Sequence, residues 1–190
     1  FWTVDPLDGT QHFIERATGY ATSIALVRRD GTPLLGIVYD PVHDALYEAV
    51  AGEGVSVNGK PMRPVAPAKD SQKVTWFADL SLRRHPAFAR YGDHFHICFE
   101  GGAVMNAIHL LTTPSSVYLK PPRRVVGGCA IWDLAAVSLM LTELHGRALD
   151  YTMQPLHLNQ AGTVFFHETG LILSSNGVNL EGVLSALEDP

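Results

Sequence analysis

The residues best suited to chemistry lie in the opening stretch FWTVDPLDGTQHF (1–13), where two carboxylates, Asp5 and Asp8, end an apolar, strand-like run. The proline between them fixes one backbone dihedral, and Gly9 and Thr10 complete a sequence typical of a turn. One interpretation is a solvated strand end with an ordinary Asp-Gly turn. The other is a site at a sheet edge, where the carboxylates hold a cation and free backbone N–H groups hold a phosphate.

A third carboxylate, Asp133, lies in the stretch GGCAIWDLAAVSLMLTELHG (127–146). Apolar residues recur there with helical spacing and predict a helix over 131–144, with Gly146 at its C-terminal cap. Asp133 then falls in the first turn, where the partial positive charge of the helix N-terminus favours a carboxylate. Capping alone explains such a residue. An oriented, ionised carboxylate is also what a hard cation needs from an oxygen ligand.

The elements that must position these carboxylates differ along the chain. The β-rich runs 22–30, 33–39 and 44–51 are separated by strong turn signals and predict three successive antiparallel strands. After the linker-like stretch RPVAPAKDS (63–71), predicted helices and strands alternate, with one of the later strands at 163–166. The sequence therefore predicts an α/β fold in which an antiparallel sheet is followed by a mixed α/β half.

Length and composition place both halves, residues 1–68 and 69–190, in one globular unit. With 190 residues and 46% hydrophobic content, the chain can bury a sizeable core. Its net charge of −5 does not favour nucleic acid as a partner, and no apolar run approaches the roughly 18 residues of a membrane helix. Two cysteines without a C-x-x-C pattern suggest neither a disulfide framework nor a zinc site, and a reducing cytoplasm fits best.

The two motifs together resemble a known family. WTVDPLDGTQHF, followed much later by IWDLAA, is similar to the two signatures of the inositol-monophosphatase-like superfamily of magnesium-dependent, lithium-sensitive phosphatases. The stretch 36–62, which ends in an Asn-Gly-Lys turn, follows the same order. Leu7 and LDYT (149–152) look most like the 3'(2'),5'-bisphosphate nucleotidase branch. The resemblance implies a layered α/β sandwich of the sugar-phosphatase type.

The resemblance also implies a role for each residue of the motifs. Asp5, Asp8 and Asp133 would be carboxylate ligands of Mg²⁺, with the backbone carbonyl of Leu7 as a further ligand. Gly9 and Thr10 would offer N–H groups to the phosphate, and the Thr10 hydroxyl would help orient the attacking water. The expected chemistry is hydrolysis of a phosphomonoester, which needs the phosphoryl charge neutralised and a water placed in line.

Further residues offer weaker signals for substrate binding. Gly101 and Gly102 precede a predicted helix and form either an anion site at its N-terminus or a plain turn. Lys120, Arg123 and Arg124 belong to the run KPPRR, which is either a solvated loop or a holder of a second substrate phosphate. Cys129 beside the second motif is interpreted as a small core residue, because no histidine lies near it in sequence.

Two departures from the family pattern give rise to a second functional hypothesis. Family members carry a glutamate ligand in a region before the first motif, and this chain begins after that point; Val137 also replaces the usual glycine of the second signature. The first hypothesis is a phosphomonoesterase acting on a small phosphorylated metabolite, with adenosine 3',5'-bisphosphate or an inositol or sugar phosphate as candidates. The second is an inactive metal- and anion-binding fragment or pseudo-enzyme that acts through association. Preceding residues or a second subunit, as in a homodimer, are expected to cover Phe1, Trp2 and Val4.

Overall fold

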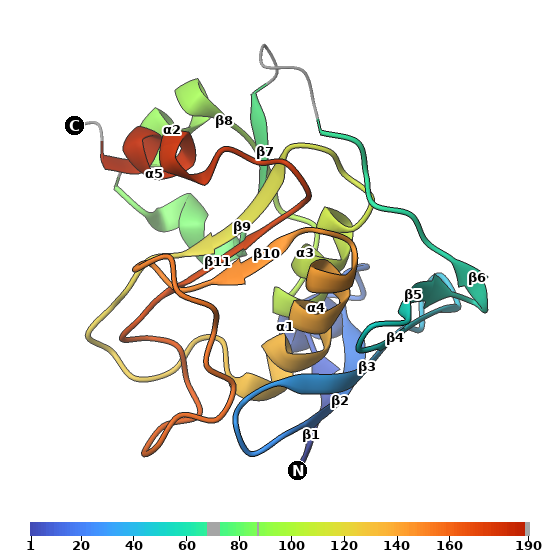
Figure 1. Ribbon diagram of the computed structural model, residues 1–190. Helices are drawn as coiled ribbons and strands as arrows, with labels where there is room; N and C mark the ends of the chain where they lie inside the picture. The colour runs from blue at the N-terminus through green and yellow to red at the C-terminus, as the bar shows by residue number, and fades with distance from the viewer. Residues whose placement is uncertain (68–72, 87, 189–190) are drawn as a thin grey trace.

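The computed structural model describes residues 1–67, 73–86 and 88–188, and these form two β-sheets with helices packed between and beside them (Figure 1). The layered α/β architecture expected from the sequence is confirmed. The strands are β1 (Trp2–Asp8), β2 (Ala21–Val27), β3 (Pro33–Asp40), β4 (Ala45–Val50), β5 (Gly54–Val57), β6 (Lys60–Pro61), β7 (Val74–Phe77), β8 (Phe95–Cys98), β9 (Ser116–Lys120), β10 (Arg147–Leu149) and β11 (Leu171–Ser174). The helices are α1 (Thr10–Ile14), the 3-10 helix η1 (Leu80–Arg84), α2 (Phe88–His94), α3 (Ala103–Leu110), α4 (Ile131–Glu143) and α5 (Leu180–Glu188).

The first sheet is an antiparallel meander in which β1 to β6 follow one another in chain order. Burial alternates along β2, where Ala21, Ser23, Ala25 and Val27 face inward, because successive side chains of a strand point to opposite faces. From β2 onward the strands are joined by short turns, whereas the connection from β1 to β2 contains α1. The expected run of antiparallel strands is confirmed. β1 lies at the edge of this sheet, and its outward face exposes apolar side chains, including Trp2.

The second sheet has the strand order β10-β11-β9-β7-β8, and its strands β9 and β11 are buried on both faces. β7 pairs in parallel with β8 and β9, whereas β11 pairs antiparallel with β9 and β10. Neighbouring residues of one strand enter different cores: Tyr118 packs into the larger hydrophobic cluster, and Leu119 packs into the smaller one. A strand covered on both sides needs apolar residues at consecutive positions, as this sequence provides.

Helices α3 and α4 lie between the two sheets, as Figure 1 shows. Every residue of α4 from Asp133 to Leu141 is buried, including Val137, which is packed in the larger core. A helix that is apolar all round must be covered all round, and the two sheets supply that cover. The approach is close at Gly36 of β3, which faces the backbone of Ala136. The position of the N-terminus of α4, and so of Asp133, is therefore set by packing against both sheets.

The other face of the second sheet is covered by η1, α2 and α5. Trp76 of β7 is the largest fully buried side chain there and packs its ring against Tyr91 of α2 and Phe95 of β8. Leu180 and Val183 of α5 complete this smaller core. In the part of the chain that the structure describes, no helix has the length and apolar character needed to cross a membrane.

Two local features differ from the sequence predictions, and one prediction is not tested by the described residues. The strand expected at 163–166 is reduced to a single bridge between Ala130 and Phe165, because the flanking loop does not run alongside a second strand. The helix α1 directly after Gly9 was not expected, since it is five residues long and has no side-chain cap. The predicted boundary between residues 68 and 69 falls outside the described residues.

We predict that Gly36→Ala destabilises the protein by about 1–3 kcal/mol, because the added methyl group would overpack the contact between β3 and α4. An ideal Cβ at Gly36 would lie 2.9 Å from both the Cα and the carbonyl oxygen of Ala136, which are backbone atoms that cannot rotate away. Urea-induced unfolding measures the change.

Gly92→Ala in α2 is the matched control for this prediction. A Cβ at Gly92 meets no atom within 4 Å, and alanine favours a helix by up to about 1 kcal/mol over glycine. An unchanged free energy of unfolding in Gly36→Ala would show that α4 shifts without cost and that its position is not fixed by this contact.

Candidate metal centre

A β-bulge in β1 brings Asp5 and Asp8 to the same side of the strand. Residues three apart in a regular strand point to opposite faces, but the pairing of β1 with β2 shifts register between these two residues. Pro6 lies inside the bulge, where its missing N–H costs no ladder hydrogen bond. The Pro6 carbonyl instead accepts a hydrogen bond from the Thr22 hydroxyl, at 3.0 Å. The bulge at Asp-Pro-Leu-Asp therefore turns the side chain of Asp8 inward.

Asp8 is held by the N-terminus of α3. Its Oδ2 accepts the backbone N–H of Val104 at 2.9 Å, which satisfies one of the free donors of that helix. The contact requires glycine at the neighbouring position, because a Cβ at Gly102 would clash with Asp8 Oδ2 and with the backbone of Gly9. The two-glycine sequence before α3 thus allows the first motif to approach the helix closely.

Asp133 is oriented by its own helix. Its Oδ2 accepts the N–H of Ala130, the residue before the helix, at 2.8 Å. A long-range hydrogen bond from the Ser23 hydroxyl to the Trp132 carbonyl, at 3.1 Å, ties this first turn to the middle of β2. The second motif is therefore anchored directly to the strand that pairs with the first.

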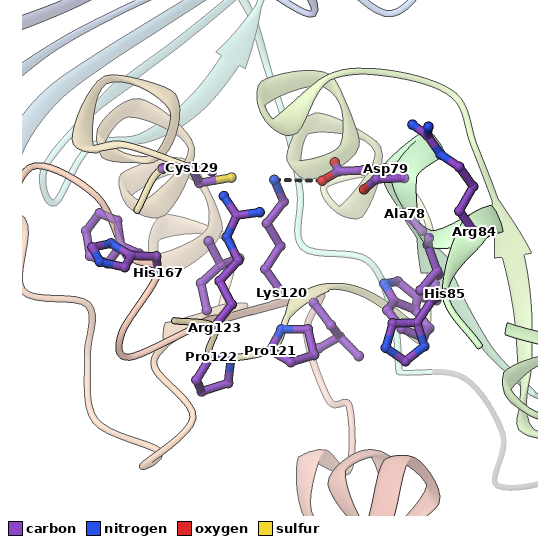
Figure 2. Close-up of a pocket in the computed structure, with 18 of the residues that line it drawn as sticks. Ala78, Asp79, Arg84, His85, Lys120, Pro121, Pro122, Arg123, Cys129 and His167 are labelled. Carbon is purple, nitrogen blue, oxygen red and sulfur yellow. Dashed lines mark ion pairs between the residues drawn. The ribbon is translucent and has the colours of Figure 1, made fainter. Parts of the chain in front are cut away.

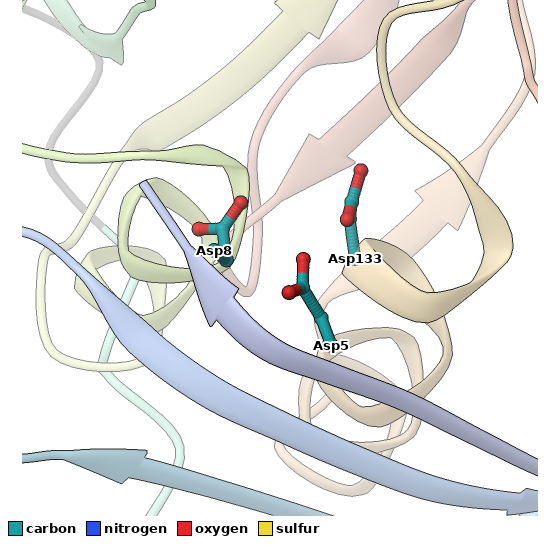
Figure 3. A group of neighbouring side chains, drawn as sticks. All are labelled: Asp5, Asp8 and Asp133. Carbon is teal, nitrogen blue, oxygen red and sulfur yellow. The ribbon is translucent and has the colours of Figure 1, made fainter. Parts of the chain in front are cut away.

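The three carboxylates converge (Figure 3). One oxygen from each of Asp5, Asp8 and Asp133 lies within 4.8 Å of the others, and no other group of three or more metal-ligating side chains among the described residues is as close. Asp8 and Asp133 are each only 8% exposed, while Asp5 is partly exposed. Two sequence motifs separated by more than half of the chain thus meet at one point.

Burial and mutual repulsion disfavour the charged forms of these groups. Burial raises the pKa of Asp8 to about 6, with the Val104 N–H opposing it and the charge of Asp5 adding to it. Burial also raises the pKa of Asp133 well above its ordinary value, opposed by the Ala130 N–H and reinforced by Asp8. A cation bound among the oxygens would reverse both effects. Clustered carboxylate oxygens fit a hard divalent ion such as Mg²⁺ or Ca²⁺.

The other predicted site residues lie next to the cluster. Gly9 adopts the left-handed conformation, with φ of 77°, and starts α1. The Thr10 hydroxyl donates to the Leu7 carbonyl at 3.1 Å, so these two predicted residues contact each other. The N–H of Gly102 donates to the Gly19 carbonyl, and Gly101 packs against the same glycine. Their predicted roles in binding metal or phosphate stay predictions.

A cavity of about 440 Å³ lies between the segment after β7 and the loop after β9. Lys120 and Arg123, marked in the sequence as candidate anion-binding residues, both line it, whereas Arg124 does not. Cys129 is buried in the core at its inner end, as the sequence indicated. Asp79 also lines this cavity and was not foreseen, since nothing in the stretch FADLSLRR has the spacing of a known motif.

Comparison with known proteins identifies relatives of this chain. The curated relatives include the Nus factor SuhB of Pasteurella multocida, 30% identical over 79% of this chain and 56% of the relative. They also include the 3'(2'),5'-bisphosphate nucleotidase CysQ of Aggregatibacter actinomycetemcomitans, 28% identical over 84% of this chain and 59% of the relative. Inositol monophosphatase 1 of Xenopus laevis is 29% identical over 80% of this chain and 54% of the relative. The chain thus spans little more than half the length of these three relatives.

Solved structures show the same fold. Inositol monophosphatase II of Staphylococcus aureus superposes with a TM-score of 0.77 at 24% identity, over 98% of this chain and 66% of that one. The inositol monophosphatase of Anabaena superposes with a TM-score of 0.76 at 23% identity, over 98% and 72%. The model of the family described as "Inositol monophosphatase family" matches residues 1–189. The sequence motifs, the fold and this match together show that the chain belongs to the inositol monophosphatase family.

Proposed function

We propose that this protein is a magnesium-dependent phosphomonoesterase that hydrolyses a small phosphorylated metabolite. The observation that carries the proposal is the convergence of Asp5, Asp8 and Asp133 within 4.8 Å, from motifs on different elements. Adenosine 3',5'-bisphosphate, inositol phosphates and sugar phosphates are the candidate substrates. The names of relatives support the first two, since both a bisphosphate nucleotidase and an inositol monophosphatase are among them.

The chain's own residues would share the work as follows. Asp5, Asp8 and Asp133 would hold Mg²⁺, assisted by the Leu7 carbonyl. Bound Mg²⁺ would neutralise charge on the phosphoryl oxygens and lower the pKa of a water. Thr10, whose hydroxyl already points to the Leu7 carbonyl, would orient that water. The backbone of Gly9 and Thr10 would bind phosphate oxygens.

The structure supports these roles because backbone hydrogen bonds hold the carboxylates in place in the absence of substrate. Each of the three accepts a backbone N–H, from Leu7, Val104 or Ala130 respectively. Groups that are fixed in advance lose little free energy to reorganisation when charge develops in the transition state. Donors on a strand, on a helix N-terminus and before a second helix set the three orientations independently.

A second candidate function is binding of metal and anions without turnover, with action through association. It is favoured by the relatives named Nus factor SuhB, of which this chain covers 56% in one case and 67% in another. The two functions share the carboxylate cluster and differ only in whether a phosphoester is cleaved. Metal binding and turnover must therefore be measured separately.

One prediction for the proposed site concerns metal binding and pH. Without metal, the folded-state pKa of Asp8 is about 6 against an ordinary 3.8, so the folded protein binds this proton more tightly than the unfolded chain. The corresponding stability is complete below about pH 4 and is lost as pH rises through about 6. Mg²⁺ at about 100 times its Kd at pH 8 should raise Tm by about 5–10 °C there, and the same concentration should raise Tm by less near pH 5, where protons compete for the carboxylates. Thermal unfolding with Mg²⁺ or with EDTA measures this.

Asp133→Asn makes the test more specific, because its effect on stability relative to wild type should differ between EDTA and Mg²⁺. The variant removes a buried charge and keeps an acceptor for the Ala130 N–H, so in EDTA near pH 8 it should be at least as stable as wild type. With Mg²⁺ it should gain little. Asp93→Asn in α2 makes the same change of charge away from the cluster and should behave as wild type. An equal Mg²⁺ shift in all three proteins would place the metal elsewhere.

Another prediction for the proposed site concerns turnover. Phosphate release from adenosine 3',5'-bisphosphate and from inositol 1-phosphate should require Mg²⁺, and Asp133→Asn should lower kcat by about 100-fold or more. Thr10→Ala should lower kcat by a smaller factor and leave the Mg²⁺-dependent rise in Tm intact, because it removes the hydroxyl and no metal ligand. Full activity in Asp133→Asn would contradict the proposed site. Metal-dependent stabilisation without turnover of any phosphomonoester would favour the second function.

A further inference from the structure

A second cavity, of about 520 Å³, is lined by three histidines and two carboxylates. It shares no lining residue with the cavity drawn in Figure 2. The histidines come from three different elements: His12 from α1, His43 from the turn after β3, and His109 from the last turn of α3. Asp40 at the end of β3 and Glu100 before α3 supply the carboxylates. Imidazole and carboxylate groups together are typical ligands of Zn²⁺.

His109 and Glu100 already have the spacing of two ligands of one ion. The Nε2 atom of His109 lies 3.6 Å from Oε2 of Glu100, which is longer than a good hydrogen bond. Two ligand atoms about 2.1 Å from a tetrahedral zinc ion are about 3.4 Å apart, so an ion can contact both with little movement. The ring of His109 stacks on that of Phe77 with the centroids 5.0 Å apart, which fixes its plane. One side of the site is therefore preformed.

His109 is also in the protonation state that a metal ion requires. Burial lowers its pKa below the ordinary value, with the charges of Glu100 and Asp40 opposing this effect and that of His43 adding to it. The imidazole is therefore mainly neutral at pH 7, and an ion can bind it without displacing a proton. His43 and Asp40 are near enough to His109 to act on its charge, which places them at the same end of the cavity.

Asp40 holds His43 in the tautomer that can bind a metal. Its Oδ2 lies 2.6 Å from Nδ1 of His43, and its Oδ1 accepts the backbone N–H groups of Val42 and His43 at 2.9 and 3.3 Å. An ionised carboxylate only accepts, so Nδ1 carries the proton and Nε2 keeps its lone pair. A carboxylate paired with an imidazole in this way orients the histidine ligands of many zinc sites. The Asp40 side chain is 3% exposed, so the group that orients His43 is itself fixed.

The cavity adjoins the backbone that shapes the first motif. Its wall includes Gly19, whose carbonyl accepts the N–H of Gly102 at 2.9 Å, and Gly102 in turn lies against Asp8. Helix α1, which carries His12, begins directly after Gly9. An ion in this cavity would therefore join the turn after β3 to the segment before α3, next to the aspartates but separate from them.

We propose that His109, Glu100 and His43 bind a zinc ion at a site separate from the three aspartates, and that Asp40 positions His43. Closing the site requires the side chains of His43 and Glu100, which are 64% and 52% exposed, to turn toward the ion. Water or His12, which lines the same cavity, completes the four ligands. Imidazole suits zinc whereas Mg²⁺ prefers oxygen, so the two sites select different ions. This zinc site is independent of the proposed function, because it involves neither the aspartates nor the cleavage of a phosphoester.

Calorimetric titration with ZnCl₂ in excess Mg²⁺ tests the site in the wild-type protein. We expect one zinc ion per chain in a single saturable step. At about 100 times its Kd, zinc should also raise Tm by about 5–10 °C over the value in Mg²⁺ alone. Asp133→Asn should bind zinc with the wild-type Kd, because Asp133 is not a ligand of this ion. Loss of zinc binding in Asp133→Asn, or several weak ions per chain in wild type, would overturn the proposal.

Variants of the exposed ligands test which residues hold the ion. His43→Gln and Glu100→Gln change exposed side chains, so both proteins should fold, and each should bind zinc about tenfold or more weakly. His109→Gln should weaken binding at least as much. His96→Gln on β8 removes an exposed histidine that does not line the cavity and should keep the wild-type Kd. An unchanged Kd in either His43→Gln or Glu100→Gln would contradict the proposed ligands.

Asp40→Asn tests positioning. The amide would donate to Nδ1 of His43 and move the proton to Nε2, so zinc binding should weaken by about 10-fold or more. The change should add nothing in the double variant with His43→Gln, because Asp40 acts only through His43. An additive loss would show that Asp40 acts by another route.

Co²⁺ in place of zinc provides a spectroscopic test of the geometry. The wild-type protein in excess Mg²⁺ should give the intense visible absorption of a tetrahedral Co²⁺ ion. Asp40→Asn should give the same spectrum once saturated, because the ligands are unchanged, whereas His43→Gln should alter it. The weak absorption of octahedral Co²⁺ in wild type would contradict the proposed zinc site.

Discussion

Repulsion among three carboxylates in a partly buried space is the constraint around which the rest of this structure is arranged. Asp5, Asp8 and Asp133 converge within 4.8 Å, and two of them are almost completely buried. Each is held by a backbone N–H, which partly offsets the loss of water but does not cancel the repulsion. The fold therefore maintains, at a cost in stability, an arrangement that a cation would relieve. Clusters of this kind are typical of function rather than of packing.

Close backbone contacts make the convergence possible. Gly102 lets the first motif reach the N-terminus of α3, and Gly36 lets α4 lie directly on β3. At the opposite end of α4, the carboxylate of Glu143 accepts the N–H groups of Gly52 and Gly54, both at 2.8 Å. The first turn of α4 is thus joined to β2 through the Ser23 hydroxyl, and its last turn is joined to the β4–β5 turn through the Glu143 carboxylate. The position of Asp133 follows from contacts along the entire length of α4.

The sequence was sufficient for the features that depend on local pattern. The strands β2, β3 and β4 are β-rich runs separated by turn signals, and α4 has apolar residues at helical spacing, so these elements were predicted. The three aspartates were identified because their motifs resemble those of a family. Features that depend on tertiary contact escaped prediction. Asp79 forms an ion pair with Lys120 and accepts a hydrogen bond from Tyr118 only because β7 lies beside β9 in the folded sheet.

The hydrogen bond between Ser23 and Trp132 has a consequence for the order of folding. It joins residues 109 positions apart, and α4 packs on β2 and β3 across a similar separation. Such contacts require a long loop to close before they contribute, so they form late and slowly. During synthesis the meander of the first sheet leaves the ribosome well before α4 does, at roughly 5–20 residues per second. For several seconds Asp5, Asp8 and the inner face of the first sheet are therefore without the contacts that α4 later provides.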